Sequence, residues 1–473
     1  MRIPRGTRSW RSSRRFSVGV AVMATACGPV AHQPPSTPVR APATKHVLVF
    51  SDLHFNPFAD PALVDSLAHA DVSRWREILA GSTKRTFSQY GSDTNYPLLV
   101  STLAAMQRAE PAAELVLFAG DFLGHNFQST FRTIARDTSA AALAAFTART
   151  NQFLAQQLAD AFPRAQILPA LGNNDSGCGD YMSQPEGAFL RSFAEAWRLL
   201  VARRGEAVNF VETFASAGHY SAYAPVLGAR VVVLNDVYWS PRYANACGSS
   251  AMQPGRAALQ WLERELADSR SRGEHVWLLT HVPAGVDVFA TLKADTLVNM
   301  LDTAYAASLV SILRRFESTV RYGIYGHTHM NDFRVIAETG GTPMLATQGI
   351  PAVSPIYGNN PAFVVLAIDS ASGSITDYAV HALTNLSVAG GTTPAAWSRE
   401  YDFASDFGGG EVSAATLARV HRAIAADSSV RTHYIRFHDA GSGRASILSS
   451  WRAYWCGIVN IDPAAFARCY RQQ

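Results

Sequence analysis

Charged residues are scarce in this chain, and long apolar runs are lacking. Only 16% of the 473 residues are Asp, Glu, Lys or Arg, whereas 48% are hydrophobic. That balance can bury a large core and excludes a mostly disordered chain. No run beyond the first 26 residues is apolar over the about 20 residues that a membrane-spanning helix needs. The sequence therefore predicts a folded globular protein.

The net positive charge of the chain comes from the amino terminus. Residues 1–26 contain six arginines and no acidic residue, lysine or histidine. The formal charge of the whole chain is +4, so the remainder carries −2. Nucleic-acid binding relies on an excess of positive charge. We therefore expect no nucleic acid as a binding partner.

The amino terminus resembles an export signal, predicted for residues 1–27. Its arginines precede a short apolar run, Phe16–Ala26, which ends in the small-x-small triplet Ala24-Thr25-Ala26. This order is typical of a signal peptide with its cleavage site. Cys27 follows directly, so the segment also resembles a bacterial lipoprotein signal in which Cys27 carries the lipid; simple cleavage is the alternative. We expect export to the bacterial periplasm or cell envelope, and a proline-rich linker at residues 28–44.

Cysteines are few as well. The chain has five, and none stands close enough to another to form the cysteine pair of a zinc site. Without Cys27 the number is even, which fits an oxidising compartment, and four cysteines allow three pairings. We favour Cys178–Cys247 together with Cys456–Cys469, which would close a local loop; buried free thiols are the alternative.

Short apolar runs alternate with amphipathic segments along residues 45–385. Segments with helical spacing are 140–161, 185–203, 256–271 and 303–316, and Pro185 suits the first position of its helix. The apolar runs, which predict strands buried on both faces, are residues 47–50, 115–119, 167–171, 231–234, 276–279, 322–325, 363–366 and 375–380. The alternation predicts an α/β fold with helices layered on sheets.

The pattern changes after residue 385. Glycines interrupt it, and residues 413–426 have helical spacing. We therefore expect a domain at residues 45–385 and a small, mainly helical C-terminal region at residues 386–473.

Polar side chains follow five of the predicted strands. Because the carboxyl ends of neighbouring strands converge on one crevice in α/β sheets, we expect these side chains to meet there. Each segment alone is a weak signal, but five in order favour a site for divalent Zn, Mn or Fe. A shared carboxylate could hold two ions and activate water, which is the equipment for hydrolysing a phosphate ester. The segments are Asp52-x-His54, Gly120-Asp121, Gly172-Asn173, His281 and Gly326-His327-Thr328-His329.

This ordered set resembles the calcineurin-like metallophosphoesterases over roughly residues 45–385. The resemblance implies a four-layer α/β/β/α sandwich and two divalent ions, with Zn expected and Mn or Fe as alternatives. It implies that Asp121 bridges the two ions. One ion would also be held by Asp52, His54 and His329, and the other by Asn173, His281 and His327.

A closer resemblance is to the acid sphingomyelinase-like phosphodiesterases. It rests on Gly120-Asp121-Phe122-Leu123-Gly124-His125, on the predicted export, and on a C-terminal extension with Trp451, Tyr454 and the Cys456–Cys469 segment. It implies a phosphodiesterase with a small-molecule phosphoester substrate. His125 would donate a proton to the leaving oxygen; alternatively, it would only hydrogen-bond a metal ligand.

Asn174 departs from the pattern of most metallophosphoesterases, which have a histidine at that position. An asparagine can donate a hydrogen bond to the substrate phosphate but cannot act as an acid near pH 7. Acid catalysis would then come from His125. The same variant resembles endopolyphosphatases, whose phosphate leaving group needs less protonation.

The sequence therefore predicts an exported dinuclear-metal phosphodiesterase. An endopolyphosphatase and a nucleotide or phosphomonoester hydrolase are alternatives on the same metal site. A non-catalytic, metal-dependent phosphate-binding envelope protein is the alternative of another class, and only Asn174 favours it. Candidate pocket residues, which could equally belong to the core, are Phe55, Asn56, Asn126, Asp180, Tyr181, Asn235 and Tyr238.

Overall fold

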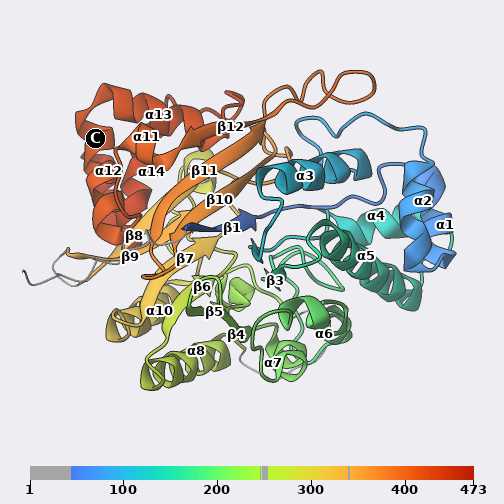
Figure 1. Ribbon diagram of the computed structural model, residues 1–473, viewed down its shortest axis with the longest axis horizontal. Helices are drawn as coiled ribbons and strands as arrows, with labels where there is room; N and C mark the ends of the chain where they lie inside the picture. The colour runs from blue at the N-terminus through green and yellow to red at the C-terminus, as the bar shows by residue number, and fades with distance from the viewer. Residues whose placement is uncertain (1–43, 246, 248–253, 339–340, 473) are drawn as a thin grey trace, which may run out of the picture. The chain divides into compact units, whose positions relative to one another are not determined.

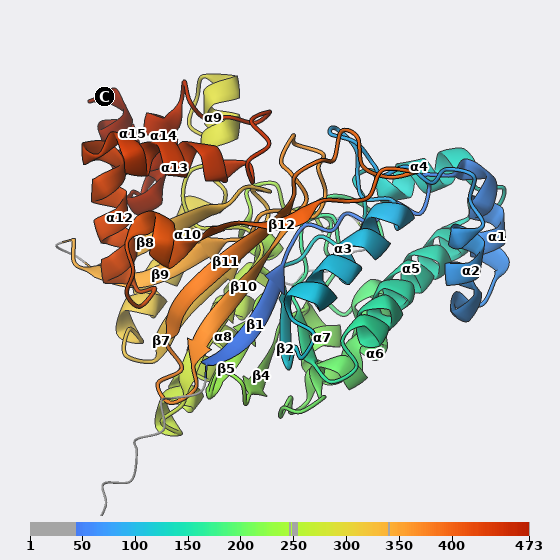
Figure 2. The same ribbon diagram turned by 45° about the horizontal axis from the view of Figure 1, so that its top comes forward.

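Two six-stranded sheets form the centre of the computed structural model, which describes residues 44–245, 247, 254–338 and 341–472 (Figure 1, Figure 2). The predicted export signal, Cys27 and the linker fall outside these residues, apart from Thr44, the last linker residue. The first sheet has the order β12-β11-β10-β1-β2-β3, with β1 (Thr44–Phe50), β2 (Leu115–Phe118), β3 (Gln166–Pro169), β10 (Ala362–Asp369), β11 (Ile375–Leu383) and β12 (Trp397–Asp402).

The second sheet has the order β4-β5-β6-β7-β9-β8. Strands β1, β2 and β3 are parallel in the first sheet, and β5, β6, β7 and β9 are parallel in the second. The members of the second sheet are β4 (Tyr220–Ala224), β5 (Ala229–Val233), β6 (His275–Leu279), β7 (Val320–Tyr325), β8 (Asp332–Ala337) and β9 (Pro343–Gly349).

Helices cover both sheets. Figure 1 shows α3, α5 and α6 beside the first sheet and α8 and α10 beside the second. The helices are α1 (Val64–His69), α2 (Trp75–Ala80), α3 (Tyr96–Ala109), α4 (Phe127–Ile134), α5 (Ala140–Ala161), α6 (Ala188–Val201), α7 (Phe210–Ala217), α8 (Pro254–Ser271), α9 (Val288–Ala294), α10 (Thr303–Arg315), α11 (Phe403–Phe407), α12 (Ala414–Ala426), α13 (Ser428–His438), α14 (Trp451–Val459) and α15 (Pro463–Arg471), with short 3-10 turns η1 (Pro61–Leu63), η2 (Val72–Arg74) and η3 (Asp236–Trp239).

The central strands are buried on both faces, as their continuous apolar runs predict. In β5, Val231 and Val233 join the core that contains the strands of the first sheet. Val232 and the following residue, Leu234, join a second core with α8 and α10. Successive strand residues point to opposite faces, so one strand serves two layers of packing. The predicted four-layer α/β/β/α sandwich is confirmed.

Each predicted strand overlaps a strand of the structure, but the start of one helix was predicted wrongly. Helix α6 begins at Ala188 and not at Pro185. The N–H of Gly187 donates to the carbonyl oxygen of Gln184 at 3.1 Å, and Glu186 has a positive φ of 56°. This turn separates Pro185 from the helix.

The C-terminal region packs against the second sheet. Helices α12 and α14 contact β8, and α12 also contacts β9. The predicted disulfide pairs are both present, with Cα–Cα distances of 5.8 Å for Cys456–Cys469 and 5.6 Å for Cys178–Cys247. The boundary expected at residue 385 stays a prediction, because β12 continues the first sheet beyond it.

A loop of the C-terminal region, residues 438–442, holds two loops at the strand ends. The N–H of Asn331, two residues after His329, donates to the carbonyl oxygen of His438 at 2.8 Å. The N–H of Asn360 donates to the carbonyl oxygen of Asp439 at 3.1 Å, and its side-chain amide donates to the carbonyl oxygen of Ala440 at 2.9 Å.

Within the described ranges, none of the helices combines the length and apolar character needed to cross a bilayer.

Candidate dinuclear metal centre

The seven predicted ligands come together at the carboxyl ends of five strands. Three of these strands, β1, β2 and β3, belong to the first sheet, and two, β6 and β7, belong to the second. Within the first sheet, the N–H of Asp52 donates to the carbonyl oxygen of Gly120 at 2.9 Å. Between the sheets, His281 Nδ1 lies 2.7 Å from the carbonyl oxygen of Ala119. All seven are at most intermediate in exposure. They are Asp52 and His54 after β1, Asp121 after β2, Asn173 after β3, His281 after β6, and His327 and His329 after β7.

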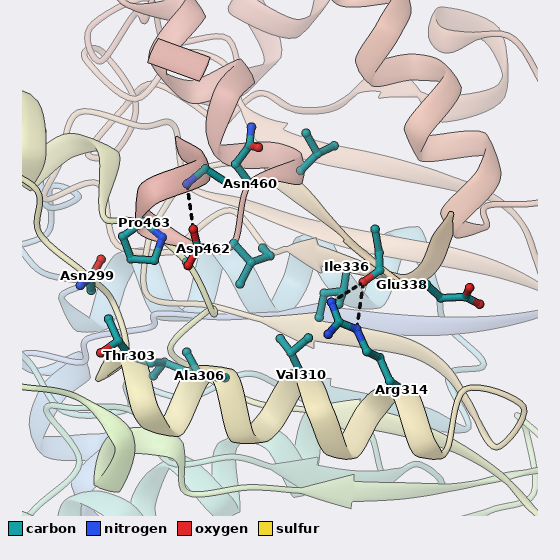
Figure 3. Close-up of a pocket in the computed structure, with 17 residues that line it drawn as sticks. Asn299, Thr303, Ala306, Val310, Arg314, Ile336, Glu338, Asn460, Asp462 and Pro463 are labelled. Atoms are coloured by element: carbon teal, nitrogen blue, oxygen red, sulfur yellow. Dashed lines mark hydrogen bonds between the residues drawn. The ribbon is translucent and has the colours of Figure 1, made fainter. Parts of the chain in front are cut away.

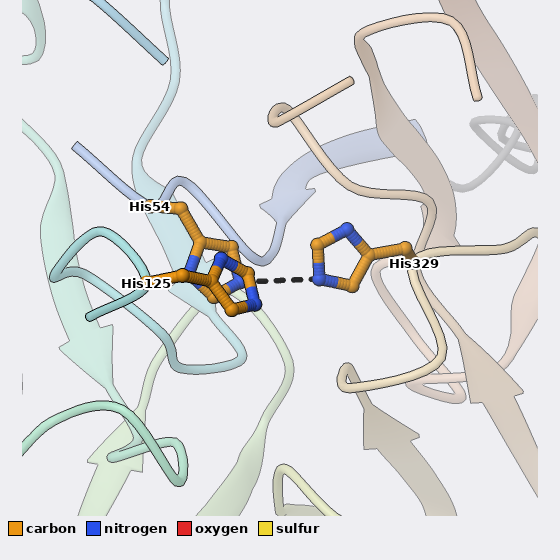
Figure 4. Close-up of side chains that lie close together, drawn as sticks. All are labelled: His54, His125 and His329. Carbon is orange, nitrogen blue, oxygen red and sulfur yellow. Dashed lines mark hydrogen bonds between the residues drawn. The ribbon is translucent and has the colours of Figure 1, made fainter. Parts of the chain in front are cut away.

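Four of these residues form a first group. The Nε2 atoms of His54 and His329 lie 3.1 Å apart (Figure 4). His54 Nε2 lies 3.4 Å from Asp121 Oδ2, and His329 Nε2 lies 3.4 Å from Asp52 Oδ1. Ligand atoms around a tetrahedral zinc ion at about 2.0–2.1 Å lie roughly 3.3 Å apart. The nitrogen and oxygen atoms of this group therefore fit a divalent ion.

A second group shares Asp121 with the first. His281 Nε2 lies 3.3 Å from Asp121 Oδ2 and 3.1 Å from Asn173 Oδ1. The same Asn173 oxygen lies 2.8 Å from His327 Nδ1. Because Asp121 Oδ2 is close to histidines of both groups, it has the position of a ligand that two ions share. The arrangement fits two divalent ions, and the role of each ligand stays a prediction.

The far nitrogens of three rings have partners of their own. His54 Nδ1 lies 3.1 Å from the carbonyl oxygen of Leu123, and His281 Nδ1 lies 2.7 Å from that of Ala119. His327 Nε2 lies 3.2 Å from the hydroxyl oxygen of Tyr181. A carbonyl partner fixes the proton on the far nitrogen and leaves the near nitrogen free to bind a cation.

The backbone at the centre is strained. Five of the seven predicted ligands have positive φ, a conformation that costs a residue other than glycine roughly 1–3 kcal/mol. Residues with this conformation include His54, Asp121 and His329, whose ligand atoms lie close together. The φ angles are 49° for Asp52, 43° for His54, 58° for Asp121, 69° for His327 and 61° for His329.

Gly120 precedes Asp121 because no side chain fits there. Its φ is 94°, and a Cβ atom would lie 2.7 Å from His281 Nδ1 and 2.8 Å from the backbone nitrogen of Gly172. Both distances are shorter than nonbonded contacts allow. The Gly-Asp pair therefore reflects close packing between the two sheets as well as chemistry.

Two buried carboxylates support the ligands, and sequence reasoning gave neither a role. Asp175 accepts hydrogen bonds from the N–H groups of Asp121 (2.9 Å), Phe122 (2.8 Å), Leu123 (3.1 Å) and Gly172 (2.9 Å). It thereby joins the turns after β2 and β3.

Asp236 does the same after β6. It accepts from the N–H groups of His281 (3.1 Å) and Val282 (3.0 Å). The only local signal for Asp236 was that it closely follows a predicted strand.

His125 lies at the edge of the first group and is held by Asp93. Its N–H and its Nδ1 lie 2.6 Å and 2.9 Å from the two oxygens of Asp93. Its ring stacks on that of His54 at 4.0 Å, and one of its nitrogens lies within 4.8 Å of a nitrogen of His54 and of His329 (Figure 4). Burial opposes ionisation of Asp93, but the hydrogen bond from His125 helps to lower its pKa.

Asn174 contacts the shared aspartate. Its backbone N–H donates to Asp121 Oδ1 at 2.8 Å, and its side-chain amide donates to Asp121 Oδ2 at 3.0 Å. The contact with a substrate phosphate that we expected for Asn174 stays a prediction.

Three of the candidate pocket residues are buried. Phe55, Asn235 and Tyr238 are 0–2% exposed, which fits the alternative that they belong to the core, and a pocket role for them stays a prediction. Tyr181 and Asp180 lie beside the second group: Asp180 accepts a hydrogen bond from the side-chain amide of Asn173 at 2.7 Å. Tyr181 reaches His327 as described above.

The structure also has a hollow of about 380 Å³ (Figure 3). It is lined by residues of α10, β8 and the start of α15, such as Val310, Ile336 and Pro463. Arg314 at its wall donates to the carbonyl oxygen of Ala337. None of the seven predicted ligands lines it, so this hollow is not the candidate centre.

The fold and the centre together define a class, the metal-dependent phosphoesterases. A two-sheet α/β sandwich brings oxygen and imidazole ligands to a shared carboxylate, which is how such enzymes bind two ions. The sequence profile of the calcineurin-like phosphoesterases matches residues 45–331, and the chain belongs to this family.

Curated relatives are named as phosphodiesterases. Sphingomyelinase phosphodiesterase D of Dictyostelium discoideum is 26% identical over 72% of this chain and 72% of its own length. A cyclic GMP-AMP phosphodiesterase of Mus musculus is 24% identical over 95% of this chain and 97% of its own. Acid sphingomyelinase-like phosphodiesterase 3b of Homo sapiens is 25% identical over 81% of each chain.

Solved structures are more distant. A dimetal phosphatase from Danio rerio covers 74% of this chain and 98% of its own, with 12% identity and a TM-score of 0.39. The structure of PhoD covers 76% of this chain and 69% of its own, with a TM-score of 0.41. Likeness at this level does not bear on activity.

Loss of Asp121 should remove both ions. Because its carboxylate serves both groups, Asp121→Asn should reduce the metal content from about two ions per chain to near none. His327→Asn changes a side chain that contacts Asn173 of the second group and keeps the backbone N–H that donates to Asp52, so this variant should lose about one ion. Metal content is measured by mass spectrometry after dialysis against buffer. If the Asp121→Asn protein still bound one ion per chain, the shared role of Asp121 would be contradicted.

Metal binding should strengthen as pH rises. Burial disfavours imidazolium, but nearby carboxylates, Asp121 foremost, outweigh it and raise the pKa of His54 to about 9 and that of His281 to about 10. In metal-free protein both rings therefore hold a proton at neutral pH that the cation must displace. Zinc affinity, measured by competition with a chelator, should rise roughly 10- to 100-fold per pH unit between pH 6.5 and 8. A flat profile would contradict these assignments.

Proposed function

We propose that this metallophosphoesterase is an exported phosphodiesterase that binds two divalent ions, zinc first, with manganese or iron as alternatives. One ion would be held by Asp52, His54, Asp121 and His329, and the other by Asp121, Asn173, His281 and His327. The observation that carries the diesterase assignment is the Asp93–His125 pair beside the first group. The relatives named as phosphodiesterases support the same reaction class.

Asp93 and His125 would together protonate the leaving oxygen. When bound, two divalent ions activate water and neutralise charge on the phosphate. Asp93 accepts from His125 Nδ1, which turns the opposite nitrogen, Nε2, outward from the pair. Ser354 donates to the same Asp93 oxygen at 3.3 Å and helps to fix it. His125 is thereby positioned to give a proton to the departing alkoxide, which has to be protonated to leave readily.

A second candidate is hydrolysis of phosphoanhydrides or phosphomonoesters at the same ions. Asn174 favours it, because an amide held on Asp121 cannot supply a proton. Without an acid at position 174, substrates with good leaving groups would react most readily.

Export is supported by the two disulfides, which form in oxidising compartments. Attachment of a lipid to Cys27, as a membrane tether in the bacterial envelope, is a proposal from the sequence alone. The proposed substrate is a small molecule, with no nucleic acid as a binding partner.

The assay compares a diester with a monoester. Purified protein with added Zn²⁺ or Mn²⁺ should cleave bis-p-nitrophenyl phosphate faster than p-nitrophenyl phosphate, and a chelator should abolish both activities because the ions supply the nucleophile. Preference for the monoester would favour a phosphatase or nucleotidase instead. Cleavage of neither by protein shown to contain metal would contradict the diesterase and favour an anhydride-specific enzyme or a phosphate-binding protein.

His125→Ala should slow poor leaving groups more than good ones. An acid that protonates the leaving oxygen contributes roughly 100- to 10,000-fold, and less where the leaving group is already stable as an anion. Diesters with alkyl and p-nitrophenyl leaving groups are compared by kcat/KM. The matched control is His46→Asn, a half-exposed histidine bonded to Glu110. Equal slowing of both substrates would rule out the acid role.

A further inference from the structure

Contacts through Asp180 and Tyr181 link Arg242 to the second ligand group. Arg242 Nη2 donates to Asp180 Oδ2 at 3.1 Å, and its guanidinium carbon lies 4.3 Å above the ring of Tyr181. Tyr181 reaches the predicted ligand His327, and Asp180 accepts from the predicted ligand Asn173. Arg242 is therefore connected to Asn173 through Asp180 and to His327 through Tyr181.

The loop that carries Arg242 is tied to the loop that carries Asp180 and Tyr181. The Cys178–Cys247 disulfide joins the two loops covalently. The N–H of Ala244 donates to the carbonyl oxygen of Tyr181 at 2.9 Å, and the hydroxyl of Tyr243 donates to that of Ser183 at 2.9 Å. The guanidinium is thus held in place before any ligand arrives, which lowers the entropic cost of binding.

Two carboxylates, those of Asp180 and Asp287, lie near Arg242 and accept hydrogen bonds. Asp180 uses one oxygen on Asn173 and the other on Arg242. Asp287, which also faces Arg242 and Tyr181, accepts from the N–H of Ala290 at 2.9 Å as the N-cap of α9 and is half-buried. Asp180 therefore has a partner for each oxygen, and the Asp287 carboxylate accepts one hydrogen bond, at Oδ1.

The guanidinium itself is largely free. The Arg242 side chain is 65% exposed, and among the described residues its only side-chain hydrogen bond is the one to Asp180. A guanidinium has five N–H donors in a planar fork that matches two oxygens of a phosphate. The Arg242 guanidinium therefore has further N–H donors with which to bind an anion.

We propose that Arg242 binds a second phosphate group of the substrate, adjacent to the phosphate that is cleaved. The inference rests on the proposed function, and it deepens it: the substrate class is a phosphoester or phosphoanhydride with at least two phosphates. A phosphate ester whose other end is a cation, such as a choline headgroup, would meet a like charge at Arg242. His125 stacks on His54 of the first group, whereas Arg242 contacts Tyr181, which reaches His327 of the second group.

The test compares substrates with one and with several phosphates. The kcat/KM values of wild type and Arg242→Ala are measured on ATP, on tripolyphosphate and on bis-p-nitrophenyl phosphate, at constant free Mn²⁺. The ratio of ATP to bis-p-nitrophenyl phosphate should fall roughly 10- to 100-fold in the variant, mostly through KM, as loss of a charge-assisted pair predicts. Arg242→Lys, which keeps the charge without the fork, should fall between the two.

The control variant is Arg198→Ala, an exposed arginine of α6 paired with Glu195, which should leave the ratio unchanged. Equal loss on tripolyphosphate and ATP would support the inference. Loss on ATP alone would overturn it, because Arg242 would then act on the nucleoside and not on a phosphate. An unchanged ratio, or equal loss on all three substrates, would overturn the inference while the phosphodiesterase stands. Wild-type cleavage of the diester alone would overturn it as well. Absence of all cleavage would overturn the proposed function first.

Discussion

The carboxylate of Asp175, buried among four backbone N–H groups, holds the turns on which the centre depends. Burial, and then the charge of Asp121, raises the pKa of Asp175 to about 7, so four hydrogen bonds only partly offset the cost of placing a charge there. In return, one side chain fixes the turns after β2 and β3 relative to each other. Asp121 and Asn173, which follow those strands, share the second group as a consequence.

The centre is supported differently at its base and at its rim. At the base, strand ends from two sheets meet, and buried carboxylates such as Asp236 fix the turns through backbone N–H groups. At the rim, loops distant in sequence are joined by the Cys178–Cys247 disulfide and by the C-terminal loop 438–442. A rigid base suits ligands whose spacing is fixed by an ion. A rim built from loops is where relatives on one fold can differ in substrate.

The sequence allowed the strands, and the convergence of polar side chains at their ends, to be predicted, because both leave local signals. A strand buried on both faces needs a continuous apolar run such as residues 231–234, and a ligand that follows it stands at a known sheet edge. Asp93 was missed because its partner, His125, is 32 residues away and no local pattern marks it. Pro185 misled because helix propensity says nothing of the turn at Glu186 that delays the helix.

The positive φ angles at five of the predicted ligands have a consequence for the whole molecule. Strain of roughly 1–3 kcal/mol at each position sums to an amount comparable with the net stability of an ordinary domain, about 5–15 kcal/mol. Glycine would relax the backbone at any of them, but it would also delete a donor atom. A substitution that relieves the strain at one of these positions would therefore also remove a predicted ligand. An ion bound there would stabilise the folded chain, because its bonds to these side chains would offset part of the cost of the backbone strain.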